Sequence, residues 1–177
     1  MKLRLILGMV MLVSVAMWGC NNNTRSDSDT DFDEIVQASD GIILLSMEDA
    51  YVLQDITEPK RNTAEWSFKV LNKGRYEVWL TSHTKDTMNL SYEKPVIVHF
   101  GDTRLEVQPV GNEIVLNDMK VVKPYFRADS RIGSILIEDT GSYNIQVISE
   151  KVVPPEVSLR SSASTIMDKL YLIPQTH

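Results

Sequence analysis

The sequence predicts an all-β domain, built as a sandwich or a barrel. Three observations support this prediction. After residue 40 the apolar residues recur at every second position, as they do in strands with one buried face. Glycine-containing turn signals separate these runs at near-regular spacing, which is typical of sandwiches and barrels. No amphipathic helix of three turns follows the first 19 residues.

The predicted strands are short and follow one another closely. Trp66, Phe68 and Val70 alternate with polar residues and form the clearest case. Gly-Asp at 101–102 and Gly-Asn at 111–112 supply the positive φ that tight hairpin turns need. Roughly eight to ten strands are expected, and the runs that predict them are 42–45, 66–70, 76–80, 96–100, 105–107, 114–116, 135–137, 143–147 and 169–173.

The first 19 residues have the order of segments of a secretory signal. Lys2 and Arg4 precede an apolar run at 5–18, and Gly19 closes the segment before Cys20. The apolar run is shorter than the roughly 20 residues that a transmembrane helix needs. We therefore expect residues 1–19 to be a signal peptide.

Cys20 is the single cysteine, so no intramolecular disulfide can form. Its place directly after a small residue resembles the lipobox of bacterial lipoproteins. The resemblance implies that signal peptidase cuts before Cys20 and that acyl chains such as palmitate are added there. Such a protein is attached to the membrane without spanning it. The alternative is that Cys20 simply follows an ordinary cleaved signal.

Residues 20–40 are rich in Asn, Ser, Thr and Asp and are expected to form a disordered tether. The acidic run, which begins at Asp27, is similar to the surface-export signals of some bacterial lipoproteins. That similarity implies an outer-membrane protein on the cell surface. The alternatives are a solvated linker that carries no address and an anchor that faces the periplasm.

The charge balance excludes one class of partner. The formal net charge is −6, and removal of Lys2 and Arg4 with the signal makes it −8. Nucleic-acid recognition needs a basic footprint, so nucleic acid is not an expected partner. Residues 41–177 are long enough for one domain with its own core, and we expect them to form a single sandwich.

Catalytic signatures are missing from the sequence. The three histidines are His83, His99 and His177, and none has the spacing of a zinc site or a nucleophilic triad. The serines lack the flanking glycines of a nucleophile elbow, and no glycine-rich phosphate loop opens a helix. The sequence therefore gives no catalytic residue and favours a protein that is not an enzyme.

Aromatic residues at polar positions are the candidates for ligand contact. Trp79 falls on the face opposite the apolar residues of its strand, where a side chain would normally meet water. Sugar rings stack well on such an aromatic. Tyr125 and Phe126, followed by Arg127, form a second candidate in a polar loop. The alternative for both places is packing against the rest of the protein.

Two carboxylates are candidates for a structural calcium site. Glu48 lies near the start of the domain, and Asp168 opens the last strand. Sandwich topologies often bring first and last strands together, so these oxygens could contribute to the six to eight ligands of a calcium ion. Exposed carboxylates without a metal are the alternative.

Four phrases follow in order the pattern of a known family: MEDAYV, WSFKVLNKGRYEVWLTSH, SILIEDTGSYNIQVIS and IMDKLYLIP. They resemble galactose-binding-like jelly-roll modules, and above all family-6-like carbohydrate-binding modules and the accessory domains of bacterial α-L-fucosidases. The resemblance implies a jelly-roll sandwich over residues 42–174. It also implies that Glu48 and Asp168 hold calcium, and that Tyr125 and Phe126 lie near the family's aromatic loop.

The sequence thus predicts a non-catalytic surface lipoprotein that holds a glycan by aromatic stacking and hydrogen bonds. A different interpretation is a structural lipoprotein whose sandwich docks to another cell-envelope protein. An apolar surface patch would favour docking, whereas a groove with one or two aromatic rings would favour sugar. A third interpretation, a glycoside hydrolase, requires a cleft with two close carboxylates.

Overall fold

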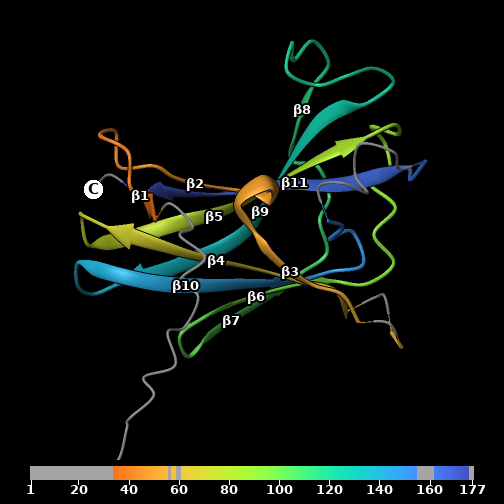
Figure 1. Ribbon diagram of the computed structural model, residues 1–177. Coiled ribbons are helices and arrows are strands. Elements are labelled where there is room, and N and C mark those ends of the chain that lie inside the picture. The colour runs from red at the N-terminus through yellow and green to blue at the C-terminus, as the bar shows by residue number, and fades with distance from the viewer. Residues whose placement is uncertain (1–33, 56, 59–60, 155–161, 176–177) are drawn as a thin grey trace, which may run out of the picture. The chain divides into compact units, whose positions relative to one another are not determined.

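The protein folds as a sandwich of two β-sheets, as seen in a computed structural model (Figure 1). The structure describes residues 34–55, 57–58, 61–154 and 162–175. The chain divides at residues 31 and 32, and the sandwich belongs to the second unit, Phe32–His177. The predicted signal peptide and Cys20 lie outside the described residues. None of the described helices is long and apolar enough to cross a membrane.

The first sheet, called sheet A, has six strands. Five of them follow the order β1-β4-β10-β6-β7. The sixth, β3, also pairs with β4, at the opposite end of that strand from β1. The bounds of its strands are β1 (Ile35–Val36), β3 (Tyr51–Leu53), β4 (Thr63–Val70), β6 (Val96–Phe100), β7 (Thr103–Val107) and β10 (Gly141–Ile148). All pairs are antiparallel except β1 with β4, which is parallel.

The second sheet, sheet B, has five strands in the order β2-β11-β5-β9-β8, all antiparallel. Their bounds are β2 (Ile43–Ser46), β5 (Gly74–Thr84), β8 (Glu113–Val115), β9 (Phe126–Ile137) and β11 (Thr165–Pro174), and a 3-10 turn η1 (Met47–Asp49) follows β2. The pairs β2 with β11, β4 with β10, β5 with β9 and β6 with β7 nest inside one another along the chain. This nesting across two sheets is the topology of a jelly roll, so the predicted fold class is confirmed.

Strict alternation along the strands builds the core between the sheets. In β4 the side chains of Trp66, Phe68 and Val70 are buried, and the residues between them face outward. The ring of Phe68 packs against Phe100, with ring centroids 6.4 Å apart. The indole N–H of Trp66 donates to the carbonyl oxygen of Ser46 at 2.6 Å, which links the two sheets by a hydrogen bond inside the sandwich.

The sandwich begins earlier in the sequence than predicted. Residues 34–40 were expected to belong to the tether, but Ile35–Val36 pair with β4, and the Gln37 side chain is buried. The amide of Gln37 donates to Gly41 O at 2.6 Å and to Tyr76 Oη at 2.7 Å, and its oxygen accepts two backbone N–H groups from the β4–β5 turn at 2.8 and 2.7 Å. The polar, acidic composition of this segment predicted a tether, so the burial of Gln37 was not expected from the sequence.

Sheet B contains two β-bulges, at each of which the pairing register of two strands shifts. The register of β5 against β9 shifts between Val78 and Trp79, opposite Gly133. Gly133 has φ of 156°, and a Cβ there would lie 3.1 Å from Leu105 of the facing sheet, so glycine permits the close approach. A second shift in β11 lies between Met167 and Lys169. These bulges let the long strands keep one face in the core.

We expect Gln37→Ala to lower the free energy of unfolding by about 2 to 3 kcal/mol, because it leaves buried donors and acceptors without partners. Urea denaturation followed by tryptophan fluorescence measures the change. Gln54→Ala is the control, since Gln54 is exposed and should change the value by less than about 0.5 kcal/mol. Equal effects of the two substitutions would show that Gln37 does not hold the N-terminal segment.

Candidate functional site

The outer face of sheet B carries a shallow hollow of about 370 Å³. Its residues come from four different strands and from the residue before β2. We call it the sheet B hollow, and its lining consists of Ile42, Glu77, Trp79, Glu113, Arg127, Asp129, Tyr171 and Ile173. In Figure 1, β8 and the segment that follows it stand above this side of the sheet. The hollow therefore has a sheet as its floor and a loop region beside it.

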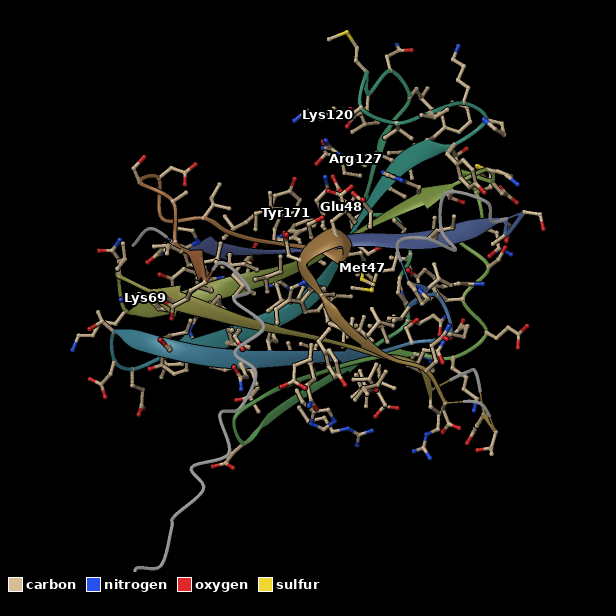
Figure 2. All side chains as sticks on the ribbon, viewed as in Figure 1. Met47, Glu48, Lys69, Lys120, Arg127 and Tyr171 are labelled. Carbon is tan, nitrogen blue, oxygen red and sulfur yellow. The ribbon has the colours of Figure 1, made fainter. Side chains whose placement is uncertain are left out.

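Two aromatic rings form the centre of the floor. Trp79 of β5 and Tyr171 of β11 are direct cross-strand partners, and such partners have Cβ atoms about 4.5 to 5.5 Å apart. Leu44 of β2 is the next residue across the sheet, and its side chain is exposed. Figure 2 shows Tyr171 and Arg127 on this outward side of sheet B. These three side chains form an apolar strip across the sheet, with Ile42 and Ile173 of the same lining beside it.

Glu77 holds the indole of Trp79 in place. One carboxylate oxygen, Oε2, accepts from the indole N–H of Trp79 at 3.1 Å. The other, Oε1, accepts from Nε of Arg131 at 3.1 Å and from the Gln175 amide at 3.1 Å. The hydrogen bond from Trp79 is the main reason why the pKa of Glu77 lies below its ordinary value, with Gln175 and Arg131 adding to it. The carboxylate is therefore held in its charged form.

A second charged group borders the same strip. Arg127 donates through Nε to Asp129 Oδ2 at 3.0 Å and through Nη1 to Asp118 Oδ2 at 2.9 Å. Thr81 donates its hydroxyl to Asp129 Oδ1 at 2.6 Å. The backbone N–H of Lys120 and the Arg127 guanidinium lower the pKa of Asp118. These contacts fix a guanidinium and a carboxylate side by side next to the aromatic rings.

The structure brings together two of the four predicted ligand-contact residues. Trp79 and Arg127 line the sheet B hollow. Tyr125 and Phe126 line a different hollow of about 300 Å³ beside the segment after β8. The Tyr125 hydroxyl donates to Ala163 O at 2.8 Å, and the Lys85 ammonium lies 4.9 Å from its ring centroid. Tyr125 thus packs against neighbouring segments, although its role in ligand contact stays a prediction.

The predicted calcium ligands lie on neighbouring elements. β2 pairs with β11 as expected for first and last strands, and Glu48 is exposed on η1 beside them. The Asp168 carboxylate lies 3.0 Å from the Lys169 ammonium and 3.4 Å from His83 Nε2. Among the described residues no three acidic, histidine or cysteine side chains gather as metal ligands. Lys169 occupies one side of Asp168, and calcium binding stays a prediction.

Sequence reasoning missed several residues of the hollow. Tyr171 stands between the buried Leu170 and Leu172, so the alternation that singled out Trp79 identifies it as well. Asp129 and Glu113 gave no such signal, because charged residues at outward positions are ordinary. Only the register of β8 against β9 shows that these two residues are cross-strand partners.

The sequence matches no protein-family model and no curated protein sequence. Similar solved structures exist. An α-L-fucosidase from Vibrio sp. strain EJY3 aligns with a TM-score of 0.59 and 16% identity over 80% of this chain. A β-(1,4)-mannanase from Podospora anserina aligns with a TM-score of 0.46 and 13% identity over 78% of this chain. The chain spans 24% of the fucosidase and 28% of the mannanase. At such identities the fucosidase likeness shows the sandwich fold alone.

We expect Glu77→Gln to lower the free energy of unfolding by about 1 kcal/mol at pH 7, because it removes a charge-assisted network. The lowered pKa means that this contribution exists above the ordinary pKa of 4.5 and is lost as the pH falls through the lower, folded-state value. Urea denaturation of the unchanged chain and of Glu77→Gln, from pH 7 to pH 3, measures the two free energies of unfolding. We expect the difference between them to shrink as the pH falls.

Glu106→Gln is the matched control, since Glu106 pairs with Arg104 at 2.7 Å on the exposed outer face of sheet A. Exposed ion pairs contribute about 0 to 1 kcal/mol. A difference for Glu77→Gln that stays constant down to pH 3 would contradict the role of its charge.

Proposed function

We propose that the chain holds a glycan on the outer face of sheet B without chemical turnover. The observation that carries this proposal is the pair of neighbouring rings, Trp79 and Tyr171, on the outward face of the sheet and in the same hollow as the Arg127–Asp129 pair. Sugar rings present apolar C–H faces that stack on aromatic rings, and their hydroxyl groups require fixed polar partners. Part of a chain named as an α-L-fucosidase shares this fold, which agrees with a sugar-related role.

The geometry suits holding a sugar better than cleaving it. A glycosidase needs a general acid whose pKa is raised. In the hollow, the pKa of Glu77 is lowered instead, because its carboxylate accepts hydrogen bonds from Trp79 and its neighbours. Glu113 and Asp129 are neighbouring carboxylates of the hollow, but both oxygens of Asp129 already accept hydrogen bonds from Thr81 and Arg127. A floor of one or two rings gains little free energy from each contact with a small polar ligand, so each site should bind weakly. Several sugar units along a polymer would increase the binding.

The proposal includes the cellular setting. The signal segment and Cys20 support a lipoprotein that is attached to the outer membrane, with the sandwich presented at the cell surface. A glycan-binding module in that place would keep a polysaccharide close to the cell.

A second candidate function is docking to another cell-envelope protein. Leu116, Met119 and Val122, in the segment between β8 and β9, have exposed side chains. Apolar side chains that gather at a surface mark contact sites for other proteins. A chain that binds no glycan but co-purifies with one envelope protein, and loses it on Met119→Ser, would favour docking.

We expect Trp79→Ala and Tyr171→Ala each to weaken glycan binding by at least about tenfold, because each removes one stacking surface. The measurement is a glycan-array screen of the full-length chain in detergent, with calcium and with a chelator, followed by calorimetry on the sugars that bind. Tyr51→Ala is the matched control, since Tyr51 is an exposed tyrosine on β3 of sheet A.

Two results of the screen would contradict this placement of the site or the proposal itself. Binding that survives both substitutions in sheet B but is lost in Tyr125→Ala or Phe126→Ala would move the site to the loop hollow. No binding on a broad array, with the chain shown to be folded, would contradict the glycan proposal.

A further inference from the structure

The cations beside the sheet B hollow are already paired, within the part of the chain that the structure describes. Arg127 contacts Asp129 at 3.0 Å and Asp118 at 2.9 Å. Arg131 contacts Glu77 at 3.0 Å. The ammonium of Lys169 lies 5.9 Å from the ring centroid of Tyr171 and contacts Asp168 at 3.0 Å. Since each of these cations has a carboxylate against it, none offers an unbalanced positive charge to an anionic ligand.

The lining of the hollow is negative. Three of its residues are carboxylates, namely Glu77, Glu113 and Asp129, and Arg127 is its single cationic residue. The formal charge of the lining is therefore −2, and Arg131, just outside the lining, balances the charge of Glu77 at 3.0 Å. A ligand carboxylate or sulfate that reaches the Glu113 side of the hollow would be repelled by the like charge.

Glu113 contributes the uncompensated part of this charge. It lies directly opposite Asp129 in the β8–β9 register, and both side chains line the hollow. Both oxygens of Asp129 have donors, from Thr81 at 2.6 Å and from Arg127 at 3.0 Å. Among the described residues no side chain pairs with Glu113, which is exposed at the rim. Like charges at cross-strand positions repel, so Glu113 has no stabilising partner among the described residues.

The paired charges suit a neutral polyol. A hydroxyl group both donates and accepts, and two adjacent hydroxyl groups can meet a carboxylate and a guanidinium together. Arg127 uses two of its N–H groups for Asp118 and Asp129, and a guanidinium has five. A sugar diol can therefore bind to this pair without any change in net charge.

From these observations we propose that the sheet B hollow selects neutral sugars, and that Glu113 is the specificity-determining residue that excludes uronic acids and sulfated sugars. The proposal rests on the glycan-binding function and names the ligand class of that site. The neighbouring Lys120, exposed in the segment after β8, lies outside the lining. Figure 2 shows it on the same side as Arg127, so its charge must be tested as well.

The test uses matched ligands that differ in one group of each sugar unit, a hydroxymethyl group or a carboxylate. Neutral plant and bacterial polysaccharides are presented to the full-length chain in detergent, each beside the same polymer after oxidation of its C6 hydroxymethyl groups to carboxylates. Affinity electrophoresis at low salt, in the presence of a chelator, gives the ratio of affinities. We expect the oxidised polymers to bind at least about tenfold more weakly, because a like charge opposes them. Added salt should bring the ratio of affinities closer to one, because it screens the repulsion between the like charges.

Glu113→Lys should bring the ratio to within about threefold while neutral polymers still bind, because it replaces the repelling charge by an attracting one. Retained neutral binding also shows that the variant is folded. Glu138→Lys is the matched control with the same change in net charge. Glu138 is exposed in the β9–β10 turn, nine residues and roughly 30 Å along the chain from Asp129, and it should leave the ratio unchanged.

Three outcomes would overturn the inference. If oxidised polymers bind the unchanged chain as well as neutral ones, and Lys120→Ala removes that binding, the site accepts acidic sugars through Lys120. An unchanged ratio in Glu113→Lys, with neutral polymers still bound, would show that Glu113 does not select. If no polymer of either kind binds, the glycan-binding function itself is wrong and the selectivity falls with it.

Discussion

The burial of one face of sheet B decides what its other face presents to solvent, because successive residues of a strand point to opposite sides. On β5, burial of Tyr76 and Val78 places Glu77 and Trp79 outside. The same alternation on β11 places Tyr171 beside Trp79. A slip of one residue would exchange the two faces completely. The candidate site is therefore a by-product of core packing, and it is as rigid as the sheet that carries it.

The charged residues around the rings position them and set the charge of the site. Glu77 binds the indole N–H of Trp79 and is itself bound by Arg131. The ring is thus oriented before a ligand arrives, which reduces the ordering cost of binding. The same pairing neutralises the two arginines, and among the charged residues of the lining Glu113 alone lacks a partner in the described part of the chain. These contacts order the ring, and the proposed selectivity comes from Glu113, the charge of the lining that they leave unpaired.

The sequence predicted the fold well because alternation and turn residues are local signals. Trp79 was found from its position on one strand, without knowledge of its neighbours. Tyr171 carries the same signal on the last strand, but its meaning depends on β11 lying next to β5, which is a pairing between distant parts of the chain. Gln37 was missed for a similar reason, since its polar neighbours indicate a linker and its partners come from the β4–β5 turn. Local sequence patterns do not indicate which distant strands pair or in which register, and these residues depend on that pairing.

The parallel pairing of β1 with β4 has a mechanical consequence. A pull toward the N-terminus along the strand slides β1 past β4, so that the hydrogen bonds between them are strained together and not opened one after another. Gln37 is the residue that follows β1, and its four side-chain hydrogen bonds resist the same motion. If the chain is anchored at Cys20 and holds a polymer at sheet B, as proposed, drag on the polymer would load this short edge strand in shear, and the hydrogen bonds of Gln37 would oppose its displacement.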